Sequence, residues 1–471
     1  MRAGGAALLI ASLLLATAWA SPPPDPARDE VIDHGRFEHL HLYKPEGPAR
    51  STALLFSGNR GWDRRAEAYA RALRDNQTLV AGIDTPALLK KLSEDGDDCE
   101  FLDGDLDNLS RFIQAYTHQD DYLPALLLGF DDAAALVFGV LAQAPAKSFS
   151  GGVGVGFCPR SVLHPPLCAG TALRQHSTPP GNELLTTSRL QSPFYAVITP
   201  TSEACGARAF IDQIPNAEMR WPVRRQSGAP SAAGAALVAY GTLAADIAPA
   251  HRKPEALPDL PLVEIPATAN TDQHRDLFAV LISGDGGWAG LDEEVADTLA
   301  AAGIPVVGMD SLRYFWTERQ PEDVAKDLDR LVAHYTGAWK RPNVMLIGYS
   351  QGADVLPFTF NRLADATRSH VVLTSAVALS EHAAFEFHVG AWAGQTSGLD
   401  TLPEINRLAG RRDFQIVCGQ EDEDAICPKL DARRFEIKLL PGSHHFDGNY
   451  DLIAQTLIDG LPAAPATAGK H

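Results

Sequence analysis

The chain has 471 residues, of which 45% are apolar, and its formal net charge at pH 7 is −19. This length predicts two or three domains, and the apolar content is sufficient for ordinary hydrophobic cores. The negative charge argues against a nucleic-acid partner and a generic anionic membrane surface, because like charges would repel, and it fits a cationic ligand better.

The first 20 residues have the pattern of an export signal. A basic start at Arg2 leads into an apolar run from Ala6 to Trp19, and Ala18-Trp19-Ala20 gives the small-residue end that signal peptidases cleave. The run is too short to favour a membrane anchor, and no later segment reaches transmembrane length. We therefore expect a cleaved signal peptide at 1–20 and a periplasmic mature protein without a transmembrane segment.

Six cysteines in an exported chain predict disulfides, because the compartment is oxidising. Cys418 and Cys427 flank one short loop in the second half and are the expected pair there. The other four allow three pairings, of which the local pair Cys158–Cys168 is favoured; these four are Cys99, Cys158, Cys168 and Cys205. No cysteine spacing resembles a zinc site.

The chain contains an internal repeat. The segment 54–62, ending in Ser-Gly-Asn-Arg-Gly-Trp, matches 280–288, which ends in Ser-Gly-Asp-Gly-Gly-Trp. Residues 126–133 likewise match 345–352. Each half alternates apolar strands with amphipathic helices, the pattern of a mainly parallel sheet flanked by helices. We predict two tandem α/β-hydrolase-like domains, at 28–248 and 261–462, joined by a proline-rich linker at 249–260.

The first of these domains is predicted to be degenerate. It has Asp131 where the second half has Ser350, and no acid–histidine arrangement follows its late strand. His164 and His176 come too early in the chain to serve. Asp131 itself is an improbable nucleophile, because Asp132 lies beside it and the histidine is missing.

In the second half, the repeat is expected to contain six strands and four helices. The strands are predicted near 278–283, 304–309, 343–349, 370–377, 413–418 and 435–440. The helices are predicted near 289–302, 321–337, 351–364 and 448–460.

The third of these strands runs into Gly348-Tyr349-Ser350-Gln351-Gly352, followed by a helix. A strand, Gly-x-Ser-x-Gly and a helix in that order are typical of the nucleophile elbow of α/β-hydrolases. The glycines are needed because flanking Cβ atoms would clash in the strained turn. Ser350 is therefore the predicted nucleophile.

Two backbone amides are predicted to form the oxyanion hole. One belongs to Gln351, and the other to Asp285 or Gly286 in the glycine-rich loop 284–287. The Asp285 side chain has two interpretations, a cap for the helix that begins near 289 or a ligand for a substrate ammonium group. Asp354 has the same two, a structural hydrogen bond or substrate binding, with the structural bond favoured.

The remaining catalytic groups should follow the serine in the order acid, then histidine. Asp422, three residues after the glycine that ends a strand, is the predicted acid, with Glu421, Glu423 and Asp424 as competitors. Two adjacent histidines follow the last strand; we favour His445 over His444 as the base of Ser350. A metal pair is a weak rival, because no third ligand stands at helical spacing. No cofactor or metal is expected.

The second half resembles the VirJ domain of bacterial virulence proteins. The motifs that carry the resemblance are 284–288, 311–316 and 348–355. The two-part layout, an inactive repeat followed by this domain, is similar to the longer AcvB proteins. The resemblance implies a periplasmic serine hydrolase that removes lysine from lysyl-phosphatidylglycerol, with Ser350, Asp422 and His445 in the catalytic roles.

The resemblance also implies partners. These are an aminoacylated phospholipid at the membrane surface and proteins of a type IV secretion system. From the residues alone, the prediction is an exported serine esterase. Two alternatives remain open: another exported carboxylesterase or thioesterase using the same three residues, and a non-catalytic binding component of a secretion apparatus.

Overall fold

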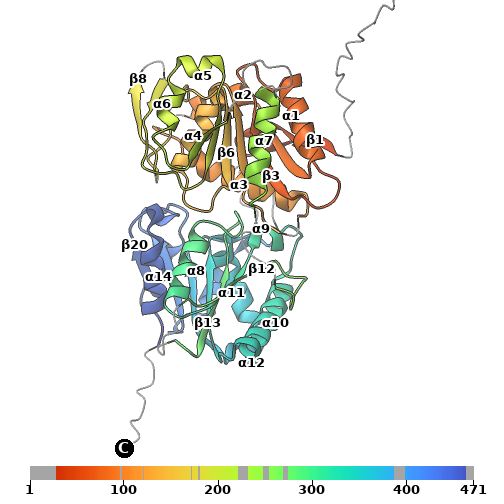
Figure 1. The fold of residues 1–471 in the computed structure, drawn as a ribbon. Coiled ribbons are helices and arrows are strands. Elements are labelled where there is room, and N and C mark those ends of the chain that lie inside the picture. Colours follow the sequence, from red (N-terminus) through yellow and green to blue (C-terminus); the bar gives the residue numbers. More distant parts are fainter. Residues whose placement is uncertain are drawn as a thin grey trace, which may run out of the picture.

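The computed structural model describes residues 28–95, 98–119, 121–170, 172–178, 181–220, 232–247, 254–268, 274–386 and 398–462. The predicted signal peptide at 1–20 and part of the predicted linker at 249–260 lie outside these ranges. Two α/β units follow one another along the chain, and each is built on its own sheet (Figure 1).

The first unit has an eight-stranded sheet of order β1-β2-β4-β3-β5-β6-β10-β11. Its strands are β1 (Asp29–His34), β2 (Phe37–Tyr43), β3 (Ser51–Phe56), β4 (Thr78–Ile83), β5 (Leu126–Phe130), β6 (Gly151–Val155), β10 (Phe194–Val197) and β11 (Ala217–Arg220). Its helices are α1 (Arg64–Asp75), α2 (Thr85–Asp95), α3 (Leu102–Tyr116), α4 (Asp132–Gln143), α5 (Pro200–Ala204), α6 (Ala207–Ile211) and α7 (Ala232–Ala244). A small antiparallel sheet adds β7 (Arg160–Ser161), β8 (Gln175–Thr178) and β9 (Gly181–Leu184).

The second unit has a seven-stranded sheet of order β12-β14-β13-β15-β16-β19-β20. Its strands are β12 (Leu262–Ile265), β13 (Leu277–Ile282), β14 (Val306–Met309), β15 (Asn343–Tyr349), β16 (Val371–Val377), β19 (Phe414–Gly419) and β20 (Glu436–Leu440). Its helices are α8 (Leu291–Ala301), α9 (Ser311–Tyr314), α10 (Pro321–Trp339), α11 (Gln351–Arg362), α12 (Asp365–Arg368), α13 (Leu402–Asn406) and α14 (Tyr450–Asp459), and β17 (His382–Ala383) pairs with β18 (Leu399–Asp400).

The two sheets confirm the internal repeat. Strands β2-β4-β3-β5-β6-β10-β11 of the first unit have the same order as β12-β14-β13-β15-β16-β19-β20 of the second. In both, one antiparallel pair precedes a parallel run. A packing detail is shared too, because the Trp62 ring lies on Gly82 and the Trp288 ring on Gly308, each so close that a Cβ would overlap it. The α/β fold class predicted from the sequence is therefore confirmed.

The central strands are apolar on both faces because helices cover both. Along β13, Phe278, Val280 and Ile282 point into a core with α10 and α11, while Ala279 and Leu281 point into a second core with α8 and α14. Buried parallel strands of this kind read as continuous apolar runs. All six strands and four helices predicted for the second half are present, with ends that differ by a few residues.

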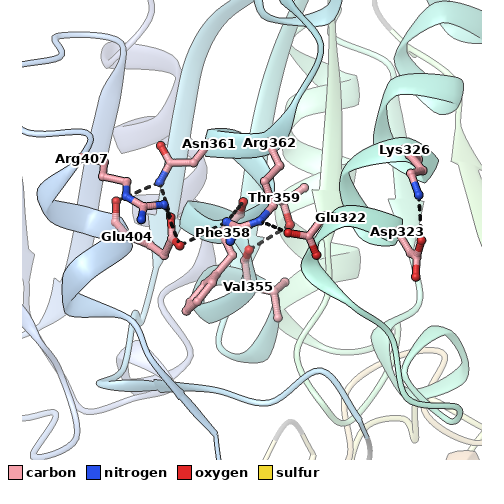
Figure 2. Close-up of polar contacts among 10 residues, drawn as sticks. All are labelled: Glu322, Asp323, Lys326, Val355, Phe358, Thr359, Asn361, Arg362, Glu404 and Arg407. Carbon is pink, nitrogen blue, oxygen red and sulfur yellow. Dashed lines mark hydrogen bonds and ion pairs between the residues drawn. The ribbon is translucent and has the colours of Figure 1, made fainter.

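A buried carboxylate anchors the far end of helix α11. The Glu404 side chain is 7% exposed and accepts from Asn361 Nδ2 at 2.7 Å, and it pairs with Arg362 and Arg407 (Figure 2). Arg362 also pairs with Glu322 of α10 at 2.8 Å. These contacts hold α11 between α10 and α13, so the helix that begins at the predicted nucleophile is fixed at its other end.

The disulfides are Cys99–Cys168, Cys158–Cys205 and Cys418–Cys427. The prediction for the last pair is confirmed, and the favoured local pair Cys158–Cys168 is wrong. Only β7 of the small sheet lies between those two cysteines in the chain, and each of them bonds a residue more distant in sequence. Three disulfides are typical of a protein that folds in an oxidising compartment. Among the described helices, none is long and apolar enough to cross a membrane.

Candidate active site

Ser350 occupies the sharp turn between β15 and α11. Its backbone angles are φ 50° and ψ −118°, in a region that side chains rarely adopt. A Cβ on Gly348 would lie 2.3 Å from the Gly352 carbonyl oxygen, and one on Gly352 would lie 2.1 Å from that of Ile282. Both glycines of the motif are therefore required by backbone contacts, and the predicted elbow is present.

Three side chains from three loops form one hydrogen-bonded series. The Ser350 hydroxyl donates to His444 Nε2 at 3.0 Å, and His444 Nδ1 donates to the Asp422 carboxylate at 3.0 Å. The Asp422 side chain is 3% exposed. A hydroxyl next to an imidazole that a carboxylate orients can lose its proton to the ring during attack on a carbonyl carbon.

Asp422 is the member of the acidic run that reaches the imidazole. Its second oxygen accepts from the Asp424 amide at 3.2 Å, which fixes the carboxylate, while Glu421, Glu423 and Asp424 are exposed. The loop follows β19, and the Cys418–Cys427 disulfide spans it. The structure therefore places the predicted acid, rather than its three competitors, in the hydrogen-bonded series.

The favoured histidine was wrong, because His444 and not His445 contacts Ser350. His445 Nδ1 is instead hydrogen-bonded to the Tyr349 hydroxyl at 2.8 Å. The loop after β20 is a tight turn in which Gly442 and Phe446 have φ of 96° and 51°. In such a turn consecutive side chains diverge, so sequence order does not reveal which ring faces the serine. Burial, reinforced by His444, lowers the pKa of His445, which favours its neutral form.

The loop 284–287 lies directly against the elbow. A Cβ on Gly284 would be 3.4 Å from the Cβ of Ser350, and the loop is closed by a bond from the Gly287 amide to the Gly284 carbonyl. Gln351 is the first residue of α11, and first-turn amides have no partner within their helix. The Gln351 amide and the 284–287 loop, which are predicted to supply the two oxyanion donors, thus lie on either side of the serine.

Asp285 does not cap the following helix. The residue at the start of α8 is Gly290, and no side chain caps it. Burial raises the pKa of the Asp285 carboxyl, an effect that nearby His444 and His445 partly offset. The carboxyl also interacts with the backbone amides of Asp285 and Gly286, so its position is compatible with holding this loop as well as with the ammonium-binding interpretation.

Asp354 lies one turn into α11 and is 8% exposed. Its Oδ1 accepts a hydrogen bond of 2.7 Å from the Ser380 amide, which ties the helix to the loop after β16. Burial raises the pKa of this carboxyl well above its usual range. Because the side chain is enclosed and already engaged, the structure favours the structural role of Asp354 over substrate binding.

Comparison with known proteins identifies the second unit. The family model described as "Bacterial virulence protein (VirJ)" matches residues 276–464. These residues form a VirJ domain. The match includes Ser350, Asp422 and His444, and together with their geometry it supports a hydrolase. No curated protein matched the chain.

Solved structures similar to the chain are α/β-hydrolases. XC6422 from Xanthomonas campestris, described as a serine hydrolase without a lid, is 14% identical, with 43% of this chain and 90% of that chain covered and a TM-score of 0.30. Est1E from Butyrivibrio proteoclasticus is 15% identical, with 42% and 91% covered and a TM-score of 0.32. Similarity at this level indicates no activity or substrate for this chain.

The first unit keeps the elbow that the VirJ domain uses, without its chemistry. Asp131 has φ 55° and ψ −119°, within a few degrees of Ser350, between the equivalent strand β5 and helix α4. A Cβ on Gly58 would lie 2.6 Å from the Asp131 carboxylate. The segment 221–231 that follows β11 lies outside the described residues, and its sequence contains no histidine. The first unit therefore has the strained turn with an aspartate in place of the serine.

In the ranges that the structure describes, there is no group of three or more His, Cys, Asp or Glu residues able to hold an ion. Two features near the VirJ site were not predicted from the sequence. One is the bond between Tyr349 and His445, and the other is the docking of α3 from the first unit beside α9 of the second (Figure 1). No motif signalled either one.

Proposed function

We propose that the VirJ domain is a serine hydrolase that cleaves the aminoacyl ester of lysyl-phosphatidylglycerol, giving lysine and phosphatidylglycerol. The observation that carries the hydrolytic part is the series Ser350–His444–Asp422, with both bonds at 3.0 Å, on a strained elbow at the start of α11. The lipid substrate rests on the resemblance to the VirJ and AcvB proteins and on the charges described below.

In the first step, Ser350 Oγ attacks the carbonyl carbon of the lysyl ester while His444 Nε2 takes the hydroxyl proton. Asp422 keeps the proton on Nδ1 and stabilises the imidazolium that forms. The oxyanion is bound by the Gln351 amide and one amide of the 284–287 loop, each contributing about 3 kcal/mol to transition-state stabilisation. His444 then protonates the glycerol oxygen, and phosphatidylglycerol leaves.

In the second step, water attacks the lysyl-serine ester. His444 removes one proton from the water and returns it to Ser350 Oγ as the tetrahedral intermediate collapses. Lysine leaves as the free amino acid, and the oxygen of the attacking water becomes one of its two carboxylate oxygens. Each step breaks one C–O bond and forms another, and neither requires a redox partner.

The substrate side of the proposal rests on charge. Aminoacyl esters carry an ammonium group one carbon from the reacting carbonyl, and Asp285 is a half-buried carboxyl near His444. We assign Asp285 to that ammonium group. The net charge of −19 would likewise attract a cationic headgroup more than an anionic one. Export to the periplasm would bring the protein to the lipid.

The test is lysine release from vesicles of phosphatidylglycerol with added lysyl-phosphatidylglycerol. Wild type should release lysine and Ser350→Ala should not, although both are folded by circular dichroism. Asp285→Asn should raise KM for the lysyl lipid by a larger factor than KM for a neutral aryl acetate. Lysine release by Ser350→Ala at the wild-type rate would end the mechanism. Hydrolysis of the aryl acetate alone would end the lipid assignment and leave a general esterase.

A further inference from the structure

Helix α3 of the first unit reaches into the active-site loop of the second. Arg111, 7% exposed, donates from Nη1 to the backbone carbonyl of Trp288, the residue that directly follows the 284–287 loop. The acceptor is a backbone carbonyl, so this hydrogen bond acts on the backbone at position 288 and not on the Trp288 side chain. The contact links the unit without a nucleophile to the one that has it.

The guanidinium is held rigidly by its own unit. Asp107, one turn earlier on α3, accepts from Arg111 Nε at 3.0 Å and from the Tyr122 hydroxyl at 3.0 Å. The Tyr122 ring lies 4.1 Å from the guanidinium carbon, a cation–π contact. Across the interface Glu293 of α8 is 3.9 Å away. These contacts restrict the Arg111 side chain to one conformation, unlike an arginine exposed on the surface.

A second residue of the same helix face lies beside the loop itself. Asn108 Nδ2 would lie 3.3 Å from a Cβ placed on Gly286. The carboxamide oxygen of Asn108 accepts from His34 Nε2 at 3.0 Å, and the His34 ring stacks on Phe112 at 3.9 Å. Asn108 and Arg111 are three residues apart and so share one side of α3.

The loop that they contact needs outside support. Three of its four residues are glycines, which leave the backbone free to rotate, and Gly287 has φ of 81°. A rotation of one peptide unit there would turn an oxyanion donor away from Ser350. Loss of one such donor typically lowers kcat by 10²- to 10³-fold.

We propose that the first unit is a positioning element of the active site. Arg111 and Asn108 hold the 284–288 backbone in the conformation that places the second oxyanion donor, an amide of the 284–287 loop, next to Ser350. The degenerate repeat then has a role that requires no chemistry of its own. This inference rests on the proposed hydrolase function, and it predicts that residues outside the VirJ domain control kcat.

The test compares full-length variants on an aryl acetate. Arg111→Met removes the bond to Trp288, Arg111→Lys keeps a cationic donor, and Asn108→Ala removes the carboxamide that lies beside Gly286. The matched control is Lys147→Met, which breaks another contact between the units, the exposed pair Lys147–Asp297 at 3.1 Å, far along α8 from the loop. The readouts are kcat, KM, the pH profile of kcat/KM, the rate of fluorophosphonate labelling and the melting temperature.

Arg111→Met should lower kcat and the labelling rate about 10- to 100-fold, with KM within about twofold and an unchanged pH profile. Arg111→Lys should recover part of the loss, and Asn108→Ala should lose a smaller part. If Arg111→Met does not fold, Asn108→Ala decides. Wild-type kcat in the folded variants, or an equal loss in Lys147→Met, would overturn the inference. If wild type itself fails to label, the proposed function is what has failed.

Discussion

His444→Ala is expected to lower kcat by at least about 10³-fold, because among the described residues His444 is the group hydrogen-bonded to the Ser350 hydroxyl. The variant should stay folded, since the His444 side chain is 29% exposed and packs at the site rather than in a core. The measurement is steady-state hydrolysis of an aryl acetate, with melting temperature as the check on folding.

His445→Gln is the matched control for that experiment. It removes the neighbouring ring and its bond to Tyr349, and leaves the Ser350–His444 contact in place. We expect kcat within about tenfold of wild type, since loop position and not proton transfer is affected. The opposite order, with His445→Gln inactive and His444→Ala active, would contradict the placement of the two rings.

Asp422→Asn is expected to lower kcat by about 10⁴-fold. A carboxamide can donate its N–H to His444 Nδ1, which leaves the proton on Nε2, and that nitrogen can then no longer accept from Ser350. The fold should be retained, because the carboxamide oxygen can still accept from the Asp424 amide. The rate should be measured from pH 6 to 9. Over this range, raising the pH should not restore the kcat of Asp422→Asn to the wild-type value.

The controls for Asp422 are its exposed neighbours. Glu423→Gln and Asp424→Asn remove the same charge from the same loop without touching His444. Both should keep kcat within about twofold of wild type, as expected for solvated surface charges. A large loss in either one, with an active Asp422→Asn, would reassign the acid.

Much of the fold was predictable because it follows from local patterns. Buried parallel strands are continuous apolar runs, and amphipathic helices alternate with them along the chain. The elbow was predictable for a steric reason, since only glycine fits at 348 and 352, where a Cβ would overlap backbone oxygens. The acid was predictable because its place after the glycine that ends β19 is set by the fold.

The errors concern features that depend on direction or on distant partners. Side chains at 444 and 445 point in different directions in a turn with left-handed residues. The sequence does not reveal which of the two points toward Ser350. Cys158 pairs with Cys205 across 47 positions, so proximity in the chain was a poor guide. The contact between Arg111 and Trp288 joins two units, and a single sequence has no pattern that aligns them.

The central claim is that Ser350 is a nucleophile activated by His444. It is tested most directly by treating the whole protein with a fluorophosphonate and locating the adduct by peptide mass spectrometry. We expect one covalent adduct, on Ser350, in wild type, and a labelling rate lower by at least about 10²-fold in His444→Ala. No adduct on wild-type Ser350, or equally fast labelling of the two proteins, would contradict it.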